Sequence, residues 1–128
     1  IERARKIRKV LGGGMRKAGV IAAPGIWVLE NMVDRLKEDH ENARKLALGL
    51  SKIPEISIDL ECVQTNIVIF ELKSISARAF VEALSRRGVK CGAIGPRRIR
   101  MVTHYGITSE DIDYTLKMVK MVLEDLLE

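Results

Sequence analysis

Apolar residues recur at helical spacing most regularly over residues 26–50. Apolar side chains return there every three or four positions, and charged residues occupy the opposite face, which predicts one long amphipathic helix closed by Lys52-Ile53-Pro54. The apolar stripe comprises Leu29, Met32, Val33, Leu36, Ala43, Leu46, Ala47 and Leu50. His40 falls on the same stripe, which favours a packed, hydrogen-bonded histidine over a metal ligand.

The rest of the chain after residue 50 alternates between strand-like and helix-like patterns. Alternating or dense apolar runs predict strands at 56–60, 66–72, 89–91 and 98–103. A helix is predicted over 76–87, and Thr108 with Asp111 at the third helical position predicts the capped start of a last helix. The predicted buried face of that helix comprises Ile112, Leu116, Val119, Leu123 and Leu126. This order predicts an α+β domain with a small, mostly antiparallel sheet of about three to four strands packed by helices.

The first 25 residues do not fit into that domain. Residues 2–11 predict a short basic helix that ends at Gly12-Gly13-Gly14. Residues 15–23 predict a helix lined with small residues, which Pro24-Gly25 then bends or interrupts. We therefore expect a lead-in segment, residues 1–25, left from a larger domain, and a small C-terminal domain, residues 26–128. The start at Ile1 inside a helix-like pattern predicts a fragment of a longer protein.

Composition excludes several classes of protein. With 128 residues and 47% hydrophobic content, the chain is not disordered and can bury one core. Charges interrupt every apolar run before the roughly 18 residues that a membrane span needs, which excludes such a span. The first residues are charged rather than apolar, so they do not have the pattern of a signal peptide. Cys62 and Cys91 fit neither a metal site nor a disulfide framework, so we expect reduced, buried thiols in a cytoplasmic protein.

The net charge of +5 is concentrated at the N-terminus. Residues 1–17 hold seven basic residues and one acidic residue, whereas the remainder holds 15 basic and 16 acidic residues. A basic segment with a glycine-rich loop can bind a phosphate group through backbone N–H groups and a following helix, or it can be a solvated helix with a hinge. Aromatic residues make up only 4% and are not interleaved with the basic run, so nucleic-acid binding is not expected.

A second basic group lies on the predicted strand 98–103. Arg98 and Arg100 share one face of that strand, and an arginine fork can bind a carboxylate through two parallel hydrogen bonds; the alternative is an ordinary exposed sheet charge. His104 follows the strand and could act as an acid or base, although a structural role is commoner there. No nucleophile with a base, paired carboxylates or metal set is present, so we assign no catalytic residue and no metal ligand.

Several stretches resemble the low-specificity L-threonine aldolases. Residues 5–19 (RKIRKVLGGGMRKAG) resemble the segment that follows the cofactor lysine of that family. Residues 34–44 resemble its long helix, and Thr65-Asn66-Ile67-Val68 and residues 99–104 (IRMVTH) resemble two later landmarks. The resemblance implies a pyridoxal-phosphate enzyme of the aspartate-aminotransferase fold type. Such enzymes cleave L-threonine or L-allo-threonine to glycine and acetaldehyde, usually as homotetramers.

The resemblance also implies roles for three residues. Arg100 would bind the α-carboxylate of the amino-acid substrate, Arg16 would reach the cofactor phosphate from a neighbouring subunit, and Lys9 would lie near that phosphate. The family's Schiff-base lysine belongs to a Ser-Lys-Gly-Leu type motif upstream of Ile1, which Ser51-Lys52 does not match. We therefore expect the small C-terminal domain of this fold type, inactive by itself. The alternatives are another lyase or aminotransferase of the same fold type, or a stand-alone basic binding or assembly module.

Overall fold

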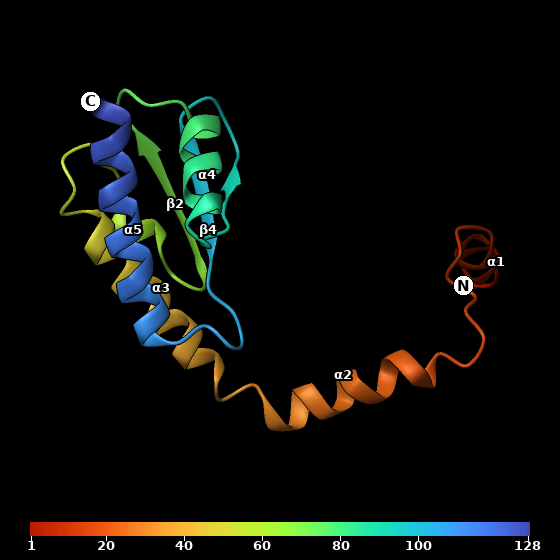
Figure 1. The fold of residues 1–128 in the computed structure, drawn as a ribbon. Helices are drawn as coiled ribbons and strands as arrows, with labels where there is room; N and C mark the ends of the chain where they lie inside the picture. Colours follow the sequence, from red (N-terminus) through yellow and green to blue (C-terminus); the bar gives the residue numbers. More distant parts are fainter. The chain divides into compact units, whose positions relative to one another are not determined.

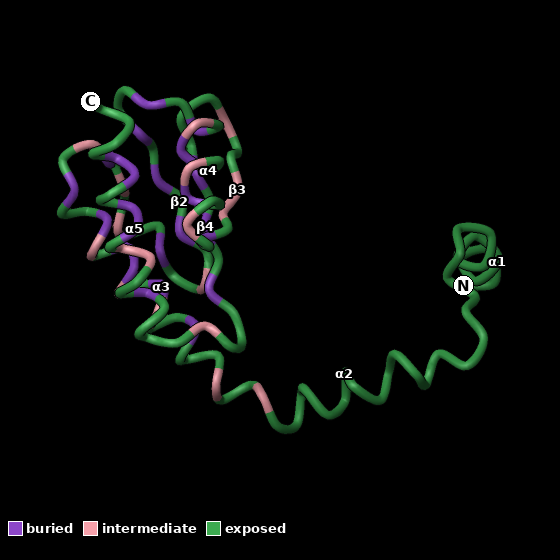
Figure 2. The backbone as a smooth tube through the Cα atoms, viewed as in Figure 1, coloured by how far each residue is buried: buried purple, intermediate pink, exposed green.

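The computed structural model describes residues 1–128 and divides into two compact units, residues 1–35 and residues 36–128. The N-terminal unit contains helix α1 (Glu2–Val10) and helix α2 (Gly19–Asn31), and neither helix has a buried residue (Figures 1 and 2). The predicted basic helix ending before Gly12 is confirmed. No helix in the chain combines the length and the apolar content that a membrane crossing requires.

Helix α2 differs from the predicted helix boundaries. It runs through Pro24, where a bend or an interruption was expected. The proline lies inside the helix and removes the intrahelical bond to the carbonyl of Val20. The prediction of one helix over 26–50 is also wrong, because α2 ends at Asn31. The Asn31 side-chain amide donates to the Trp27 carbonyl (2.8 Å) at this end of the helix, and the N–H of Met32 donates the capping bond to the carbonyl of Val28 (2.8 Å).

The C-terminal unit is a four-stranded antiparallel sheet with helices on one face (Figure 1). Its strands lie in the order β1 (Ile56–Ser57), β2 (Ile67–Leu72), β4 (Arg98–Val102) and β3 (Gly92–Ala93). The helices are α3 (Leu36–Leu50), α4 (Ala77–Arg86) and α5 (Ser109–Leu127). This arrangement confirms the predicted α+β class and the mostly antiparallel sheet.

Two predicted strands are shorter or displaced. Beyond β1 the chain forms the 3₁₀ helix η1 (Leu60–Cys62), because the Asp59 carboxylate accepts the backbone N–H of Glu61 (3.0 Å) and turns the chain. The strand predicted at 89–91 begins later, at Gly92. The N–H of Val89 is instead committed to the carbonyl of Leu84 at the end of α4.

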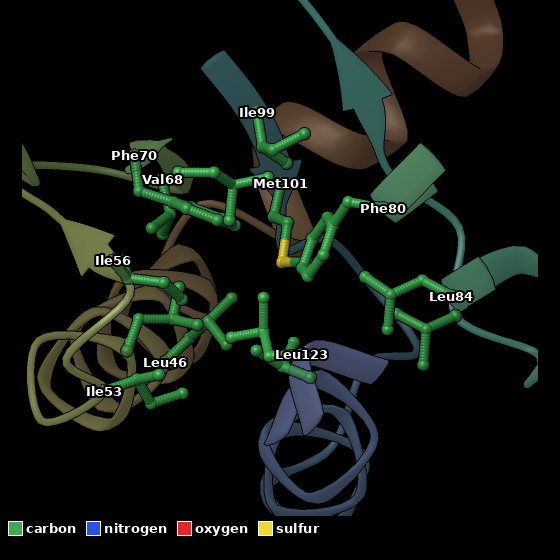
Figure 3. Packing of buried hydrophobic residues seen from close by; sticks show 14 of the residues in the cluster. Leu46, Ile53, Ile56, Val68, Phe70, Phe80, Leu84, Ile99, Met101 and Leu123 are labelled. Carbon is green, nitrogen blue, oxygen red and sulfur yellow. The ribbon is translucent and has the colours of Figure 1, made fainter. Parts of the chain in front are cut away.

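Buried residues of the two central strands, β2 and β4, and of the helices α3, α4 and α5 form one core, which Ile56 of β1 also joins (Figure 3). The inward positions of β2 and β4 are Val68, Phe70, Leu72, Ile99 and Met101. Phe70 and Phe80 meet edge to face with ring centroids 6.1 Å apart, which joins β2 to α4. This core covers one face of the sheet only. Because it fixes the pairing of the strands, it also fixes which side chains lie next to each other on the opposite face.

The buried face of α3 is displaced from the predicted stripe. It consists of Asp39, Ala43, Leu46, Ala47 and Leu50. His40 and Leu36 are exposed, so the expectation of a packed His40 is wrong. Because one residue turns an α-helix by about 100°, burying position 39 directs position 40 away from the core.

The last helix largely follows its prediction. Thr108 and Asp111 form a reciprocal capping box at its start, as expected. Ile112, Val119 and Leu123 are buried, but Leu116 is only half-buried. Leu126 is exposed because the final turn of α5 extends past the core, so its predicted burial is wrong.

Candidate functional site

The face of the sheet that the helices do not cover carries Arg100. Exposed positions alternate with buried ones along β2 and β4, so Ile67, Ile69 and Glu71 share this open face with Arg98, Arg100 and Val102. The register places Arg100 directly between Ile69 of β2 and Gly92 of β3. We call these three neighbours, Ile69, Arg100 and Gly92, the Arg100 row.

The two arginines that were predicted to share a face do so, and neither makes an ion pair or a side-chain hydrogen bond. The neighbouring Arg97 instead takes the local acceptors. Its Nε lies 3.8 Å from an oxygen of Glu71, and its Nη1 donates to the carbonyl of Lys73 (2.6 Å). The guanidinium groups of Arg98 and Arg100 therefore remain available to an incoming anion.

A buried polar anchor fixes the end of β4 that carries Arg100. The Thr103 hydroxyl donates to the carbonyl of Asp39 in α3 (2.6 Å), and the Thr103 N–H donates to the carbonyl of Asn66 (2.9 Å). The Asn66 side-chain amide returns a bond to the Thr103 carbonyl (2.8 Å). These bonds tie β4 to β2 and to α3. They give Asn66 and Thr103, which belong to two of the stretches that resemble the aldolases, a structural role.

A hollow of about 310 Å³ borders the Arg100 row on its β2 side. The loop residues Cys62, Val63, Gln64 and Thr65 line it together with Ile67 and Ile69. Ile69 is thus both a wall of this hollow and the cross-strand neighbour of Arg100. Sequence reasoning missed the hollow, because only the folded register brings the loop beside the open face.

His104 follows the anchor but joins no catalytic group. Its side chain is exposed, and its Nδ1 lies 2.8 Å from the carbonyl of Tyr105. His40 is also exposed, with no bond to His104. Neither histidine has a carboxylate or nucleophile bonded to it, so the geometry gives no acid–base pair.

The cysteines differ from each other and, in part, from expectation. Cys62 is exposed rather than buried, and its thiol donates to the Asp59 carboxylate (3.2 Å). That hydrogen bond and the negative charge of Asp59 raise the pKa of Cys62, because the thiolate would face a carboxylate. Cys91 is half-buried, and burial raises its pKa to about 11. Both thiols are therefore poor nucleophiles at neutral pH.

The glycine loop of the N-terminal unit uses most of its N–H groups in bonds to α1, which weighs against the first of the two alternatives for this segment, phosphate binding through backbone N–H groups. The N–H of Gly12 donates to the carbonyl of Lys9 (3.2 Å), and that of Gly13 donates to the carbonyl of Arg8 (2.7 Å). Gly12 has a φ of +90°, and a Cβ at Gly13 would lie 2.9 Å from the Arg8 carbonyl oxygen. The glycines are needed to cap α1 tightly, so two of their three N–H groups are not free for an anion.

The same loop passes against the side chain of Lys9, one of the two residues expected at the cofactor phosphate. A Cβ at Gly14 would lie 2.9 Å from Cγ of Lys9, so the chain passes against the Lys9 side chain just two residues before Arg16. Lys9 and Arg16 are exposed and make no hydrogen bond or ion pair. A pair of free cations beside a compact turn fits the phosphate of pyridoxal phosphate in its charge.

Known proteins with similar sequences match most of this chain. The low-specificity L-threonine aldolase 1 of Arabidopsis thaliana is 32% identical over 126 residues, covering 96% of this chain and 35% of that protein. The low specificity L-threonine aldolase of Escherichia coli (strain K12) is 37% identical over 112 residues, covering 88% of this chain and 32% of that protein. The chain thus spans about a third of the length of these curated relatives.

Solved structures show the same fold. The cysteine desulfurase CsdA of Escherichia coli superimposes with a TM-score of 0.69 at 18% identity, over 78% of this chain and 28% of that one. A NifS-like protein superimposes with a TM-score of 0.65 at 21% identity, over 71% of this chain and 28% of that one. The profile of the family described as "Beta-eliminating lyase" matches residues 1–73, which is more than half of the chain. This chain therefore belongs to the beta-eliminating lyase family.

Proposed function

We propose that the chain is the C-terminal part of a pyridoxal-phosphate-dependent aldolase that cleaves L-threonine or L-allo-threonine to glycine and acetaldehyde. The curated relatives carry the name low-specificity L-threonine aldolase. The observation that carries the proposal is Arg100, an arginine without a partner on the open face of a sheet whose other face is fully packed. Such an arginine is suited to bind the α-carboxylate of an amino acid.

Arg100 would bind and orient the substrate. Its planar fork can donate two parallel hydrogen bonds to a carboxylate, which fixes the orientation of the amino acid as well as its position. The Thr103 anchor ties the strand to β2 and α3, and Ile69 is the apolar cross-strand neighbour of Arg100. Arg100 thus acts by binding rather than by moving a proton.

Lys9 and Arg16 are proposed to hold the cofactor phosphate. The support for this is that their positive charges are unpaired and that the turn at Gly12–Gly14 passes against the Lys9 side chain, two residues before Arg16. When bound, pyridoxal phosphate supplies an electron sink for the pair released on Cα–Cβ cleavage. The lysine that attaches it is not expected among residues 1–128, so we propose that this chain alone is inactive.

The remaining assignments follow from the same proposal. Residues 1–25 would be the lead-in from the cofactor-binding domain, and residues 26–128 would be the small domain. Arg16 would act at the site of a neighbouring subunit in a cytoplasmic homotetramer. The apolar side chains exposed along α2, including Ile21, Trp27 and Leu29, support burial of this helix in the whole protein.

The test compares Arg100→Ala with Arg98→Ala in the full-length protein supplied with cofactor. Arg98 is the matched control, because it lies on the same strand and face and is equally free of partners. Charge-assisted hydrogen bonds contribute about 1.5–3 kcal/mol, so Arg100→Ala should raise the KM for L-threonine by roughly 10- to 100-fold. Arg98→Ala should change it less than threefold.

The products decide between the reaction classes. Formation of glycine and acetaldehyde from L-threonine supports the aldolase proposal, whereas transfer of the amino group to a keto acid would identify the protein as an aminotransferase instead. An unchanged KM in Arg100→Ala would contradict the carboxylate role of that residue.

A further inference from the structure

Gly92 is a glycine that neither its backbone nor its packing requires. Its φ lies outside the left-handed region, unlike that of Gly88 or Gly106. An added Cβ would meet only the carbonyl oxygen of Arg100, at an ordinary contact distance of 3.9 Å. Glycine inside a strand weakens the strand, and it often marks a place where a ligand approaches closely. The missing side chain at Gly92 therefore calls for a reason outside the chain's own fold.

The register supplies that reason. Gly92 is the direct cross-strand partner of Arg100, so a side chain there would stand on the same open face, about 5 Å from the Cβ of Arg100. On the other flank the position is filled by Ile69. The Arg100 row is thus walled on the β2 side and open on the β3 side.

We propose that Gly92 is a positioning residue that keeps the β3 side of the Arg100 guanidinium open, so that the carboxylate of the amino acid can approach in the plane of the fork. Two parallel hydrogen bonds require such an in-plane approach, and a branched side chain at position 92 would occupy the space. This inference rests on the proposed role of Arg100 and extends it to the direction from which the ligand arrives.

The experiment uses the full-length protein with bound cofactor and measures kcat and KM for L-threonine in Gly92→Ala and Gly92→Val. We expect about a threefold rise in KM for the alanine variant and at least about tenfold for the valine variant, with kcat within twofold. The melting temperature should be unchanged or raised, because both residues suit a strand better than glycine does. Ser57→Val is the matched control, since Ser57 lies on the same face but two strands from Arg100, and its KM should not change.

A double variant separates local blocking from a general disturbance. In Arg100→Ala the row no longer binds the carboxylate, so adding Gly92→Val should raise KM by less than twofold. A KM in Gly92→Val within twofold of the parent, while Arg100→Ala raises it, would overturn this inference and leave the proposed function intact. An equal rise in the single and double variants would overturn it as well. If Arg100→Ala itself has no effect, the proposed function fails first.

Discussion

The hydroxyl of Thr103 should contribute measurably to the stability of the C-terminal unit. Thr103 is only 2% exposed, and its Oγ1 lies 2.6 Å from the carbonyl oxygen of Asp39, 64 residues away in the chain. Thr103→Val keeps the shape of the side chain and removes this bond. The Asp39 carbonyl retains its bond inside α3, so the loss should be close to the net value of one hydrogen bond, about 1 kcal/mol.

Urea unfolding of residues 36–128 measures this loss. That unit has its own core, so it should unfold cooperatively, and Thr103→Val should lower the midpoint by about 0.5 M at a urea dependence of about 2 kcal/mol per M. Thr65→Val is the control, because Thr65 is exposed and makes no hydrogen bond, and its midpoint should not move. Equal midpoints for Thr103→Val and the parent would refute the anchor and the argument that it fixes Arg100.

Two further predictions concern ionisation. Asp59→Ala removes the carboxylate whose hydrogen bond and negative charge raise the pKa of Cys62, so iodoacetamide should alkylate this exposed thiol faster at pH 8; an unchanged rate would exclude Asp59 as the cause. The pKa of Asp111 is lowered by hydrogen bonds from Thr108, so its stabilising contribution is complete above the ordinary carboxyl value of 3.8 and is lost as the pH falls through the lowered pKa. Asp111→Ala should therefore destabilise the chain at pH 7, and its difference from the parent should shrink in acid; a constant difference down to pH 2 would contradict the linkage.

Local patterns predicted those elements for which a few neighbouring residues determine the outcome. The alternation over 98–103 places Arg98 and Arg100 on one face whatever the partner strand is, and the capping box is complete within four residues. The fold class followed from the order of such elements. The break after Asn31 was missed because the apolar spacing continues across it, at Leu29, Met32, Val33 and Leu36.

The candidate site was less predictable, since it depends on register. That Gly92 and Ile69 flank Arg100 follows from pairing between segments that are far apart in the sequence. The bond from Thr103 to Asp39 likewise joins a strand to a helix that no local pattern relates. The resemblance indicated Arg100, but only the folded sheet shows that one of its flanks is open.

The two outer strands of the sheet have a consequence for association with other chains. β1 and β3 are each two residues long, so neither outer strand offers a long edge to a visiting strand. Pro54 precedes β1 and Pro96 follows β3, and a proline offers no N–H to a visiting strand. Another copy therefore has little edge on which to add a strand and extend the sheet. In any assembly of copies, this unit would therefore make its contacts through side-chain surfaces, which can form closed assemblies of fixed size rather than open-ended ones.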